Sequence, residues 1–490
     1  MVLSLTAASY YLVRGIYRRC LHPLAPFPGP LQASMTENWL YSQSLTSYPE
    51  EQFERLHSEY NTRALRIGPN ELHITDHSLY ATIYNHSAPF PKYAAFYDAF
   101  LMPHTLFTEY DPARHRQRRR MLKPFFSRSG VSSLEPVITE KARILGAKIN
   151  RICDSTVINV YDAFRALTAE VILQFAFGRP GGLIDERPSG FGSAFVDGLD
   201  VMGHGLPVLI YRPWLRAAIK LIPPGLMGAV FPEHAQFMNV EKLADESVRF
   251  WQSDTAKPAH PIMFDLLSEI ADESKHLEAT GLLVAGSGTT ASVLTTAVIQ
   301  ILHSSGVHTK LLGALEAAYS TAGRSEFIPL AELEKCDYLI ACIKEALRLG
   351  MPIPGRLPRV VPSRTRANPL IVDGKLLPPG TIVSISAYTM HTNPEIWGAD
   401  VLSYNPERWL TPSAKDLDQY LVSFSKGSRS CIAQSLAIAE ITIVLAFVFR
   451  NYELSLPPDF KVPGKVDRFT LQYAGGSPGI PVRFRRRLVG

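Results

Sequence analysis

The stretch "FSKGSRSCIAQS", Phe424 to Ser435, places one cysteine between a basic, glycine-containing loop and an apolar helical pattern. Taken alone, Cys431 has three interpretations: a buried core thiol, a nucleophile or a metal ligand. The nucleophile is the weakest of the three, because no His/Asp pattern marks partners for it. The choice between the other two depends on four further segments of the chain.

The composition suits a globular protein with a large core, since 46% of the 490 residues are hydrophobic and 19% are charged. The formal net charge of +5 is small for this length. It gives no footprint of nucleic-acid binding, but it permits contact with an anionic membrane surface or an acidic partner protein. Five cysteines without a regular spacing favour a reducing compartment. No zinc-type spacing is present, so a bound metal would take most of its ligands from outside the protein's cysteines.

The amino-terminal segment begins with an uncharged run over residues 1–13. As a helix this run spans about 20 Å, against about 30 Å for the hydrocarbon core of a bilayer. Basic residues and a proline-rich hinge follow. The pattern predicts a short membrane anchor over residues 1–20, complete or as the end of a longer segment. It also predicts a hinge over residues 21–30 and one domain over residues 31–490, on the cytosolic side that basic flanks favour.

The order of patterns along the chain indicates the fold class. Residues 64–76, "ALRIGPNELHITD", predict two short strands around a Gly-Pro-Asn turn. From about residue 130 to 350 the patterns are mainly helical, and residues 355–390 contain short β-like runs broken by proline and glycine. Nothing separates two cores. We therefore expect one large domain, mainly α with a minor β part.

Residues 279–309 contain no Asp, Glu, Lys or Arg and are long enough to span a bilayer. Their glycines, serines and threonines favour a central helix buried on all sides over a lipid-exposed one. The patch "AGSGTT", residues 285–290, is poor helix material, because glycine costs about 1 kcal/mol relative to alanine. A weak point inside a buried helix suggests that a ligand lies against it.

A charged pair lies in "KEALR", where Glu345 and Arg348 are three residues apart and can meet on a helix. The apolar stripe of that helix places the pair on the opposite side, so periodicity alone favours a solvated surface pair. Further along, "NPERW" supplies Arg408. Glu345 would then bridge two guanidinium groups.

Together these segments resemble the cytochrome P-450 family of haem-thiolate monooxygenases in their order and spacing, over nearly the whole chain. The segments are "FSKGSRSC", "KEALR", "NPERW", "AGSGTT" and "HRQRRRMLKPFFS". With "HPLAPFPGP" and "RIGPNELHI", the chain looks closest to filamentous-fungal members of the trichodiene oxygenase type. The resemblance implies a single large cytochrome P-450 fold, mainly α, around a buried haem b.

The resemblance implies roles for the residues of the quoted stretch. Cys431 is expected to be the axial thiolate on the haem iron, where its electron donation favours O–O cleavage. A helix starting at Cys431 and the backbone N–H groups of the loop are expected to keep the sulfur deprotonated. Gly427 allows a tight turn under the haem, and Phe424 shields the sulfur from water. The expected partners of the haem propionates are Arg429, Arg359, Arg119 and His115, the last standing where the family often has Trp.

Two further groups follow from the resemblance. Glu345, Arg348 and Arg408 are expected to form a buried structural network behind the haem. On the oxygen side, the Thr289 hydroxyl is expected to deliver protons, while Ala285 and Gly286 leave room for oxygen and water.

The sequence departs from the family pattern at two positions. Gly288 stands before Thr289, where an acidic residue is usual, so protons would come from water, from Thr290 or from the substrate. Ala433 stands two residues after Cys431, where the family most often has glycine.

The implied activity is insertion of one oxygen atom from O2 into an apolar secondary metabolite, with a terpenoid as the first candidate and a polyketide or alkaloid as the second. The chain has no flavin or nucleotide motif, so electrons would come from a separate NADPH–cytochrome P-450 reductase. Arg116, Arg118 and Arg120 would face outward and form part of its basic docking face. The protein is expected to be a monomer on the cytosolic face of the endoplasmic reticulum membrane, without a nucleic-acid partner.

Five segments are expected to line the substrate cavity, because they are rich in aromatic and aliphatic residues with few charges. They are residues 90–107, 196–211, 285–289, 352–357 and 469–473. Two other functions stay open: an isomerase or dehydratase that keeps the haem but inserts no oxygen, and a non-catalytic haem or ligand-binding protein.

Overall fold

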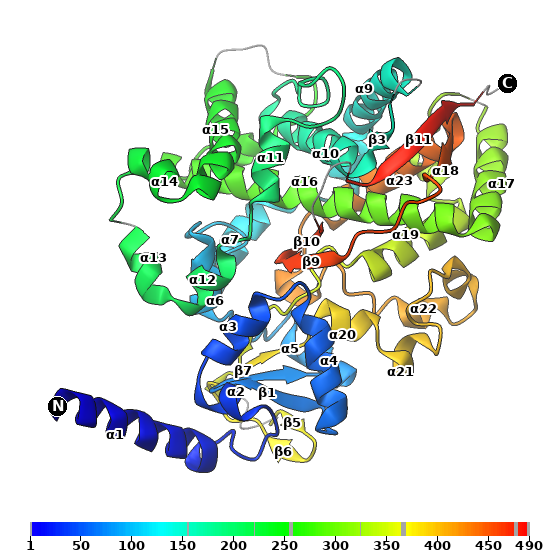
Figure 1. Cartoon of the computed structure of the whole chain (residues 1–490). Helices are drawn as coiled ribbons and strands as arrows, with labels where there is room; N and C mark the ends of the chain where they lie inside the picture. Colours follow the sequence, from blue (N-terminus) through cyan, green and yellow to red (C-terminus); the bar gives the residue numbers. More distant parts are fainter. Residues whose placement is uncertain are drawn as a thin grey trace.

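A long apolar helix, α16 (Asp272–His303), crosses the middle of the molecule (Figure 1). The computed structural model describes residues 2–153, 156–219, 221–253, 258–323, 325–363, 369–474 and 479–487. Helix α10 (Val160–Phe177) packs along α16, and α19 (Asp337–Gly350) and α23 (Gln434–Asn451) also contact it. The predicted central helix is therefore present, and its neighbours come from distant parts of the chain.

The other helices surround this centre or lie in the connections between strands. The α-helices are α1 (Val2–Ile16), α2 (Leu31–Met35), α3 (Asn38–Ser44), α4 (Pro49–Glu59), α5 (Tyr80–Ile83), α6 (Ala94–Tyr97), α7 (Pro112–Leu122), α8 (Arg128–Ser132), α9 (Glu135–Ile152), α11 (Ala194–Asp200), α12 (Leu206–Tyr211), α13 (Pro213–Ile219), α14 (Pro224–Val230), α15 (Pro232–Gln252), α17 (Ser305–Thr321), α18 (Leu330–Leu333), α20 (Ala387–His391), α21 (Pro394–Trp397) and α22 (Ala414–Leu417). Short helices of other types are η1 (Tyr17–Leu21), η2 (His77–Leu79), η3 (Asp98–Phe100), η4 (Met263–Leu267), η6 (Pro406–Leu410) and η7 (Gly427–Arg429).

The largest sheet of the described chain has the order β1–β2–β7–β4. The predicted hairpin forms its first half, with β1 (Ala64–Gly68) antiparallel to β2 (Glu71–Ile74). Strand β7 (Ile382–Ser384) runs parallel to β2, and β4 (Arg359–Val360) pairs with β7 in the antiparallel sense. The sheet thus ties the amino-terminal part to residues about 300 positions later.

Three smaller sheets complete the β part. The hairpin of β5 (Ile371–Val372) and β6 (Lys375–Leu376) lies beside the largest sheet (Figure 1). The hairpin of β9 (Lys465–Arg468) and β10 (Thr470–Tyr473) lies below α16 in the same view. A three-stranded sheet joins β3 (Ile158–Asn159), β11 (Pro481–Arg486) and β8 (Tyr452–Ser455). The prediction of a mainly α chain with a minor β part is confirmed.

Two described helices, Ser274–His303 within α16 and Gln434–Asn451, are long and apolar enough to cross a membrane. In each, 67% of the most apolar window is buried inside the protein. Their apolar side chains belong to the main hydrophobic core, which also contains α9, α10 and α19. This burial agrees with the predicted core helix, since lipid-facing helices expose their apolar side chains.

Helix α1 projects from the body of the molecule (Figure 1). Several of its large apolar side chains are exposed, among them Tyr11, Leu12 and Val13. The chain rejoins the body at Arg18, whose carbonyl oxygen accepts a hydrogen bond of 2.9 Å from Arg66 Nη1.

Candidate active site

The loop before Cys431 is held by its own backbone and by a distant segment. The backbone N–H of Cys431 donates to the carbonyl of Phe424 at 2.8 Å. Gly427 has φ +74°, a left-handed conformation that favours glycine. A Cβ there would lie 2.3 Å from Tyr84 O and 2.4 Å from Asn85 O, so the glycine lets the two backbones touch.

The Cys431 side chain is exposed, yet protein surrounds it closely enough for burial to raise the pKa of its thiol. A side chain that is accessible and yet closely surrounded by protein borders an internal space. A hydrogen bond with the Ala433 backbone and the charge of Arg119 act in the opposite direction and lower this pKa. Helix α23 begins at Gln434 and not at Cys431, so the expected helix start is wrong by three residues. The residues between form a turn, in which the Ala433 backbone hydrogen-bonds to the sulfur in place of a full helix end.

A cluster of buried and half-buried basic groups lies next to this loop. Arg119 donates from Nη1 to Ser430 O at 2.7 Å and from Nη2 to Ser430 Oγ at 3.2 Å. Arg429 donates to Glu109 O at 2.6 Å. Arg359 donates to the Tyr97 hydroxyl at 2.7 Å. The four predicted propionate partners are thus brought together, with His115 buried among them.

Lys92 is a fifth member, which the sequence analysis did not single out. It is 8% exposed, and its Nζ contacts the carbonyl of Phe107. Its ammonium also lies 4.4 Å from the centre of the Tyr97 ring. A lone lysine in the aromatic segment "FPKYAAF" was the signal that could have revealed it.

These basic groups repel one another. Burial, with the charges of Arg359 and Arg429, lowers the pKa of Lys92 well below its usual value. Burial, with the charges of Arg429, Lys92, Arg119 and Arg359, lowers the pKa of His115 to about 3. Burying like charges is unfavourable unless an anion joins them.

A haem fits this arrangement. Its two propionates would supply the negative charge that the cluster needs, and guanidinium groups suit carboxylates in particular. The Cys431 sulfur, at the wall of the adjoining internal space, is the type of ligand that haem iron accepts in haem-thiolate proteins. The residues present therefore match the cofactor at both its iron and its carboxylates.

Glu345 joins the two arginines that the sequence analysis named. Arg348 donates to both of its carboxylate oxygens, at 2.9 and 2.7 Å, and Arg408 Nε donates to Oε1 at 3.0 Å. The indole N–H of Trp409 donates to Oε2 at 2.9 Å. Glu345 and Arg348 are both 0% exposed, so periodicity alone misplaced the pair at the surface. The apolar side chains of η6 and α21 cover the face of α19 that bears the pair.

The oxygen-side candidates lie in one turn of α16. The Thr289 hydroxyl donates to the carbonyl of Ala285 at 2.8 Å, and Ala285 is exposed although it lies mid-helix. A Cβ on Gly286 would meet Ile172 Cδ1 at 2.6 Å, so this glycine lets α10 approach α16. A Cβ on Gly288 would meet nothing within 4 Å.

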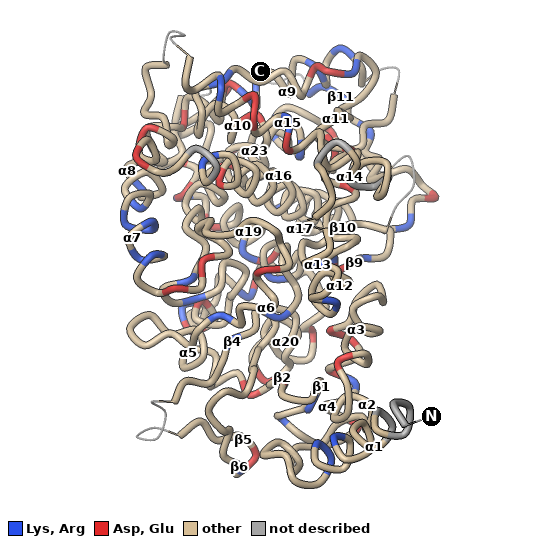
Figure 2. Tube along the Cα trace, turned by 90° about the vertical axis from the view of Figure 1, so that its left-hand side faces the viewer, with Lys and Arg blue, Asp and Glu red and all other residues tan. Residues whose placement is uncertain are grey.

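Helix α7 carries several basic residues along one edge of the molecule (Figure 2). Arg116 and Arg120 are exposed, in agreement with the expected outward face. Arg118 is different, because its side chain is only 16% exposed and pairs with Glu278 of α16 at 2.8 Å. The expectation that Arg118 faces outward is therefore wrong. Glu278 is 3% exposed and needs a charged partner there.

A small cavity joins four of the segments expected to line the substrate site. It has a volume of about 60 Å³ and is lined by Ser44, Pro49, Glu50, Phe96, Gly203, Leu206, Pro207, Ile210, Gly355, Arg356, Asp467, Arg468 and Phe469. Its acidic members, Glu50 and Asp467, were missed by sequence reasoning. Neither residue lies in an aromatic or glycine-rich motif, and only the fold brings α4 and β9 together.

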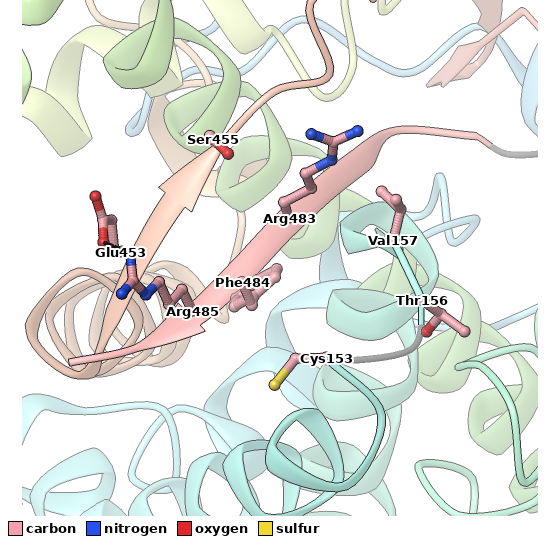
Figure 3. A pocket seen from close by; sticks show the side chains of 8 residues that line it. All are labelled: Cys153, Thr156, Val157, Glu453, Ser455, Arg483, Phe484 and Arg485. Carbon is pink, nitrogen blue, oxygen red and sulfur yellow. Dashed lines mark ion pairs between the residues drawn. The ribbon is translucent and has the colours of Figure 1, made fainter. Parts of the chain in front are cut away.

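A second cavity, of about 490 Å³, lies between β8, β11 and the end of α9 (Figure 3). It is lined by Cys153, Thr156, Val157, Glu453, Ser455, Arg483, Phe484 and Arg485. The predicted site residues do not line it, so it is separate from the candidate active site.

Comparisons with known proteins agree with this geometry. The profile of the family described as Cytochrome P450 matches residues 28–476. "Cytochrome P450 monooxygenase aneF" of Aspergillus aculeatus is 29% identical over 472 residues, 92% of this chain and 93% of that protein. "Fusicoccadiene C-8 hydroxylase" of Alternaria brassicicola is 29% identical over 482 residues, 92% and 88%. "Tryptophan 6-hydroxylase fscE" of Fusarium equiseti is 30% identical over 461 residues, 90% and 88%.

The family profile spans most of the chain, and the relatives are similar along nearly their whole length. The cofactor that fits the buried basic cluster is the one that this family carries, haem b on a cysteine thiolate. The chain therefore belongs to the cytochrome P450 family of monooxygenases.

Proposed function

We propose that this cytochrome P450 inserts one oxygen atom of O2 into an apolar secondary metabolite, with Cys431 as the axial ligand of its haem. The observation that carries the proposal is the cluster around Cys431. A sulfur at an internal space lies beside five basic groups, three of them buried and two half-buried. Arg119 donates to the cysteine loop, and Arg429 belongs to that loop and donates to Glu109. When bound, the haem supplies the activation of dioxygen that side chains alone do not provide.

The chain's own residues have separate tasks in this proposal. Cys431 would hold the iron, while Arg119, Arg359, Arg429, His115 and Lys92 would hold the propionates. The Thr289 hydroxyl holds a proton that it donates to the carbonyl of Ala285. The open space at Gly288 admits water, which would replace the usual acid as the proton source.

The proposed substrate has an apolar body. Phe96, Phe100, Phe107 and Phe469 pack against one another with ring centres 4.8–6.3 Å apart. Phe96 and Phe469 also line the small cavity. The names of the relatives include both a terpene and an amino acid as substrates, so they favour a terpenoid only in part.

The proposed electron source is a separate NADPH–cytochrome P450 reductase that docks on the exposed basic side chains of α7 (Figure 2). The proposed location is the cytosolic face of the endoplasmic reticulum membrane. Residues 1–20 would form the anchor, residues 21–30 the hinge and residues 31–490 the catalytic domain of a monomer.

The test is the absorption spectrum of the reduced, CO-bound protein, which reports directly on thiolate ligation. We expect the thiolate-type Soret band in the parent protein and its loss in Cys431→Ser. Cys20→Ser is the matched control, because Cys20 is an exposed cysteine far along the chain from the loop. Absence of the band in intact parent protein would refute the proposal.

An isomerase or dehydratase is the second candidate, favoured by the missing acid at Gly288. It is distinguished by turnover in the absence of both reductase and O2. A protein with a normal CO spectrum that turns over substrate only with reductase, NADPH and O2 is a monooxygenase.

A further inference from the structure

Two carboxyl groups meet in the small cavity beside the aromatic cluster. Glu50 is at the start of α4 and Asp467 is in β9. A Cβ built on Gly355 would lie 2.7 Å from Asp467 Oδ2 and 3.1 Å from Glu50 Oε1. Both carboxyl groups therefore lie against the same face of Gly355, in the wall of the cavity.

Glu50 is buried without a full set of partners. Glu50 is 1% exposed, and its Oε2 atom has no hydrogen-bond partner among the described residues. The nearby Tyr48 hydroxyl is also buried and unpartnered within that part of the chain. A buried oxygen that lines a cavity and accepts no hydrogen bond is costly, and a ligand that donates one removes the cost.

The charges around the cavity leave a negative excess. Arg356 is the buried cation, and it is already engaged with Glu71 at 2.9 Å and with the Tyr211 hydroxyl. Arg468 lines the cavity and is half-buried. Three carboxyl groups thus face two guanidinium groups, and one negative charge is left over.

Burial makes this negative excess unfavourable. Burial and the neighbouring carboxyl raise the pKa of Glu50 well above its usual value. Burial raises the pKa of Asp467 to about 6, whereas Arg356 and Arg468 lower it. The surroundings of the two carboxyl groups therefore favour a further positive charge at this place.

The aromatic cluster connects this cavity to the basic cluster beside the haem site. Phe96 and Phe469 line the cavity, and Phe469 packs on Phe107 with ring centres 5.4 Å apart. Lys92 Nζ lies 5.1 Å from the centre of the Phe107 ring. A molecule that extends from Asp467 toward the haem would place its body against aromatic rings and one end against carboxyl groups.

We infer that Glu50 and Asp467 bind a protonated basic nitrogen of the substrate, whose apolar body packs on the phenylalanine cluster. This inference rests on the proposed function, and it moves a nitrogen-bearing metabolite ahead of a hydrocarbon terpenoid. The ammonium offsets the excess negative charge, and one of its N–H groups donates to the unpartnered Glu50 Oε2.

The test compares two probes of equal length, phenylbutylammonium and phenylbutanol, by calorimetric titration at about pH 7.5, where a primary amine is charged. The protein is the ferrous CO-bound form, in which CO occupies the iron and the amine cannot ligate it. We expect the ammonium to bind about tenfold more tightly than the alcohol. Equal affinities would overturn the inference. A missing thiolate band in the same sample would instead refute the proposed function, so the two failures are distinguishable.

Variants of the two acidic residues test whether they cause the preference for the ammonium probe over the alcohol. The double variant Glu50→Gln/Asp467→Asn should bind both probes equally, whereas Glu51→Gln, which removes an exposed charge from the next position of α4, should keep the preference. A preference that survives in the double variant would place the amine elsewhere and overturn the inference. If the double variant does not fold, Gly355→Ala provides the second variant, because its methyl group would crowd both carboxyl groups.

A salt control separates the substrate from a free inorganic cation. Potassium chloride and tetramethylammonium chloride are compared at equal ionic strength. We expect both salts to weaken ammonium binding equally, through screening alone. Selective displacement by potassium would identify a small inorganic cation as the occupant and would overturn the inference about the substrate.

Discussion

Gly427 illustrates how the reason for a residue can lie far from it in the sequence. The resemblance predicts a glycine here because a side chain would collide with the haem. In the structure, the positive φ and the contact with the Tyr84 and Asn85 carbonyls already require glycine at this position. The close approach involves a segment more than 300 residues earlier, which no local pattern near Cys431 reveals.

Glu345→Ala is the sharpest test at the level of one residue. Removing one member of a buried charged network costs roughly 3–5 kcal/mol, because the other charges stay buried without a partner. Arg348, Arg408, Asn405 and Trp409 all donate to this carboxylate. We therefore expect little haem-loaded protein, measured as CO-binding haem per chain.

The control for Glu345→Ala is Glu332→Ala. Glu332 pairs with Lys335 at the same three-residue spacing, but both side chains are exposed. Its loss should cost less than about 1 kcal/mol. Normal haem content in Glu345→Ala would contradict the structural role.

The sequence predicted some site residues well and others not at all. Cys431, Glu345 and Arg359 stand in segments that match the family pattern, so the resemblance could single them out. Lys92 and Glu50 stand in no such motif. Their importance comes from burial beside other charges, and burial of a single polar residue depends on packing that the sequence does not display.

Two of the three glycines of helix α16, Gly286 and Gly288, lie in different surroundings. A methyl group on Gly286 would meet Ile172 at 2.6 Å, whereas one on Gly288 would meet open space. Gly286→Ala should therefore destabilise the protein by about 1–3 kcal/mol through overpacking. Gly288→Ala should stabilise it by up to about 1 kcal/mol through helix propensity. Urea unfolding of both variants checks the opposite signs, and equal shifts would contradict this packing.

A buried histidine pair joins α4 to β2. His57 Nδ1 contacts Thr62 O at 2.7 Å, so this nitrogen carries the proton. His57 Nε2 then accepts a hydrogen bond of 2.9 Å from His73 Nδ1, and both rings are neutral. Burial lowers the pKa of His57 to about 4 and that of His73 well below its usual value. A further proton would place two N–H groups against each other.

This pair predicts an acid-sensitive connection. Because the folded-state pKa values lie below the unfolded value of about 6.5, the unfolded chain takes up more protons, and stability falls as the pH drops from about 6.5 to 4. The loss should be on the order of 2 kcal/mol per histidine at about pH 5. Urea unfolding at pH 7.5 and 5 measures it. His57→Gln should show a smaller loss than the parent, and the exposed His86→Gln should show the same loss.

Arg118 was placed on the wrong face of one element. The resemblance assigned His115 and Arg119 to the haem and left Arg118 facing outward. Helical spacing puts Arg118 on the same face as these two residues. Its partner there is Glu278 on α16, which is distant in sequence.

At the scale of the whole molecule, the amino-terminal helix exposes apolar side chains and is followed by a segment that is held to the body. Helix α1 extends beyond the body with exposed Tyr10, Tyr11, Leu12 and Val13, whereas Arg18 is held to Arg66 and to the carbonyl of Met35 (Figure 1). Deleting residues 2–13 should therefore abolish binding to lipid vesicles and keep the CO spectrum. Co-flotation with vesicles measures the first property. A deletion of residues 2–21 is the comparison, because it also removes the contacts with the body and should lower stability.

For the whole molecule, the sequence predicted the fold class and the order of the elements, because the apolar pattern of a long helix is local and can be read from neighbouring residues. It was less informative about which strands pair. The parallel pairing of β2 with β7 brings together residues about 300 positions apart, and strand pairing at such separation depends on the whole chain being compact.

The spread of the basic cluster along the chain has a consequence for biosynthesis. Lys92 and Cys431 are 339 positions apart (431 − 92). At about 5–20 residues per second, the ribosome needs roughly 17–70 s to progress from one codon to the other. During that interval the early cations have been translated but the thiol has not. The set of residues proposed to hold the haem is therefore complete only when translation is nearly finished, so haem capture through Cys431 is a late event.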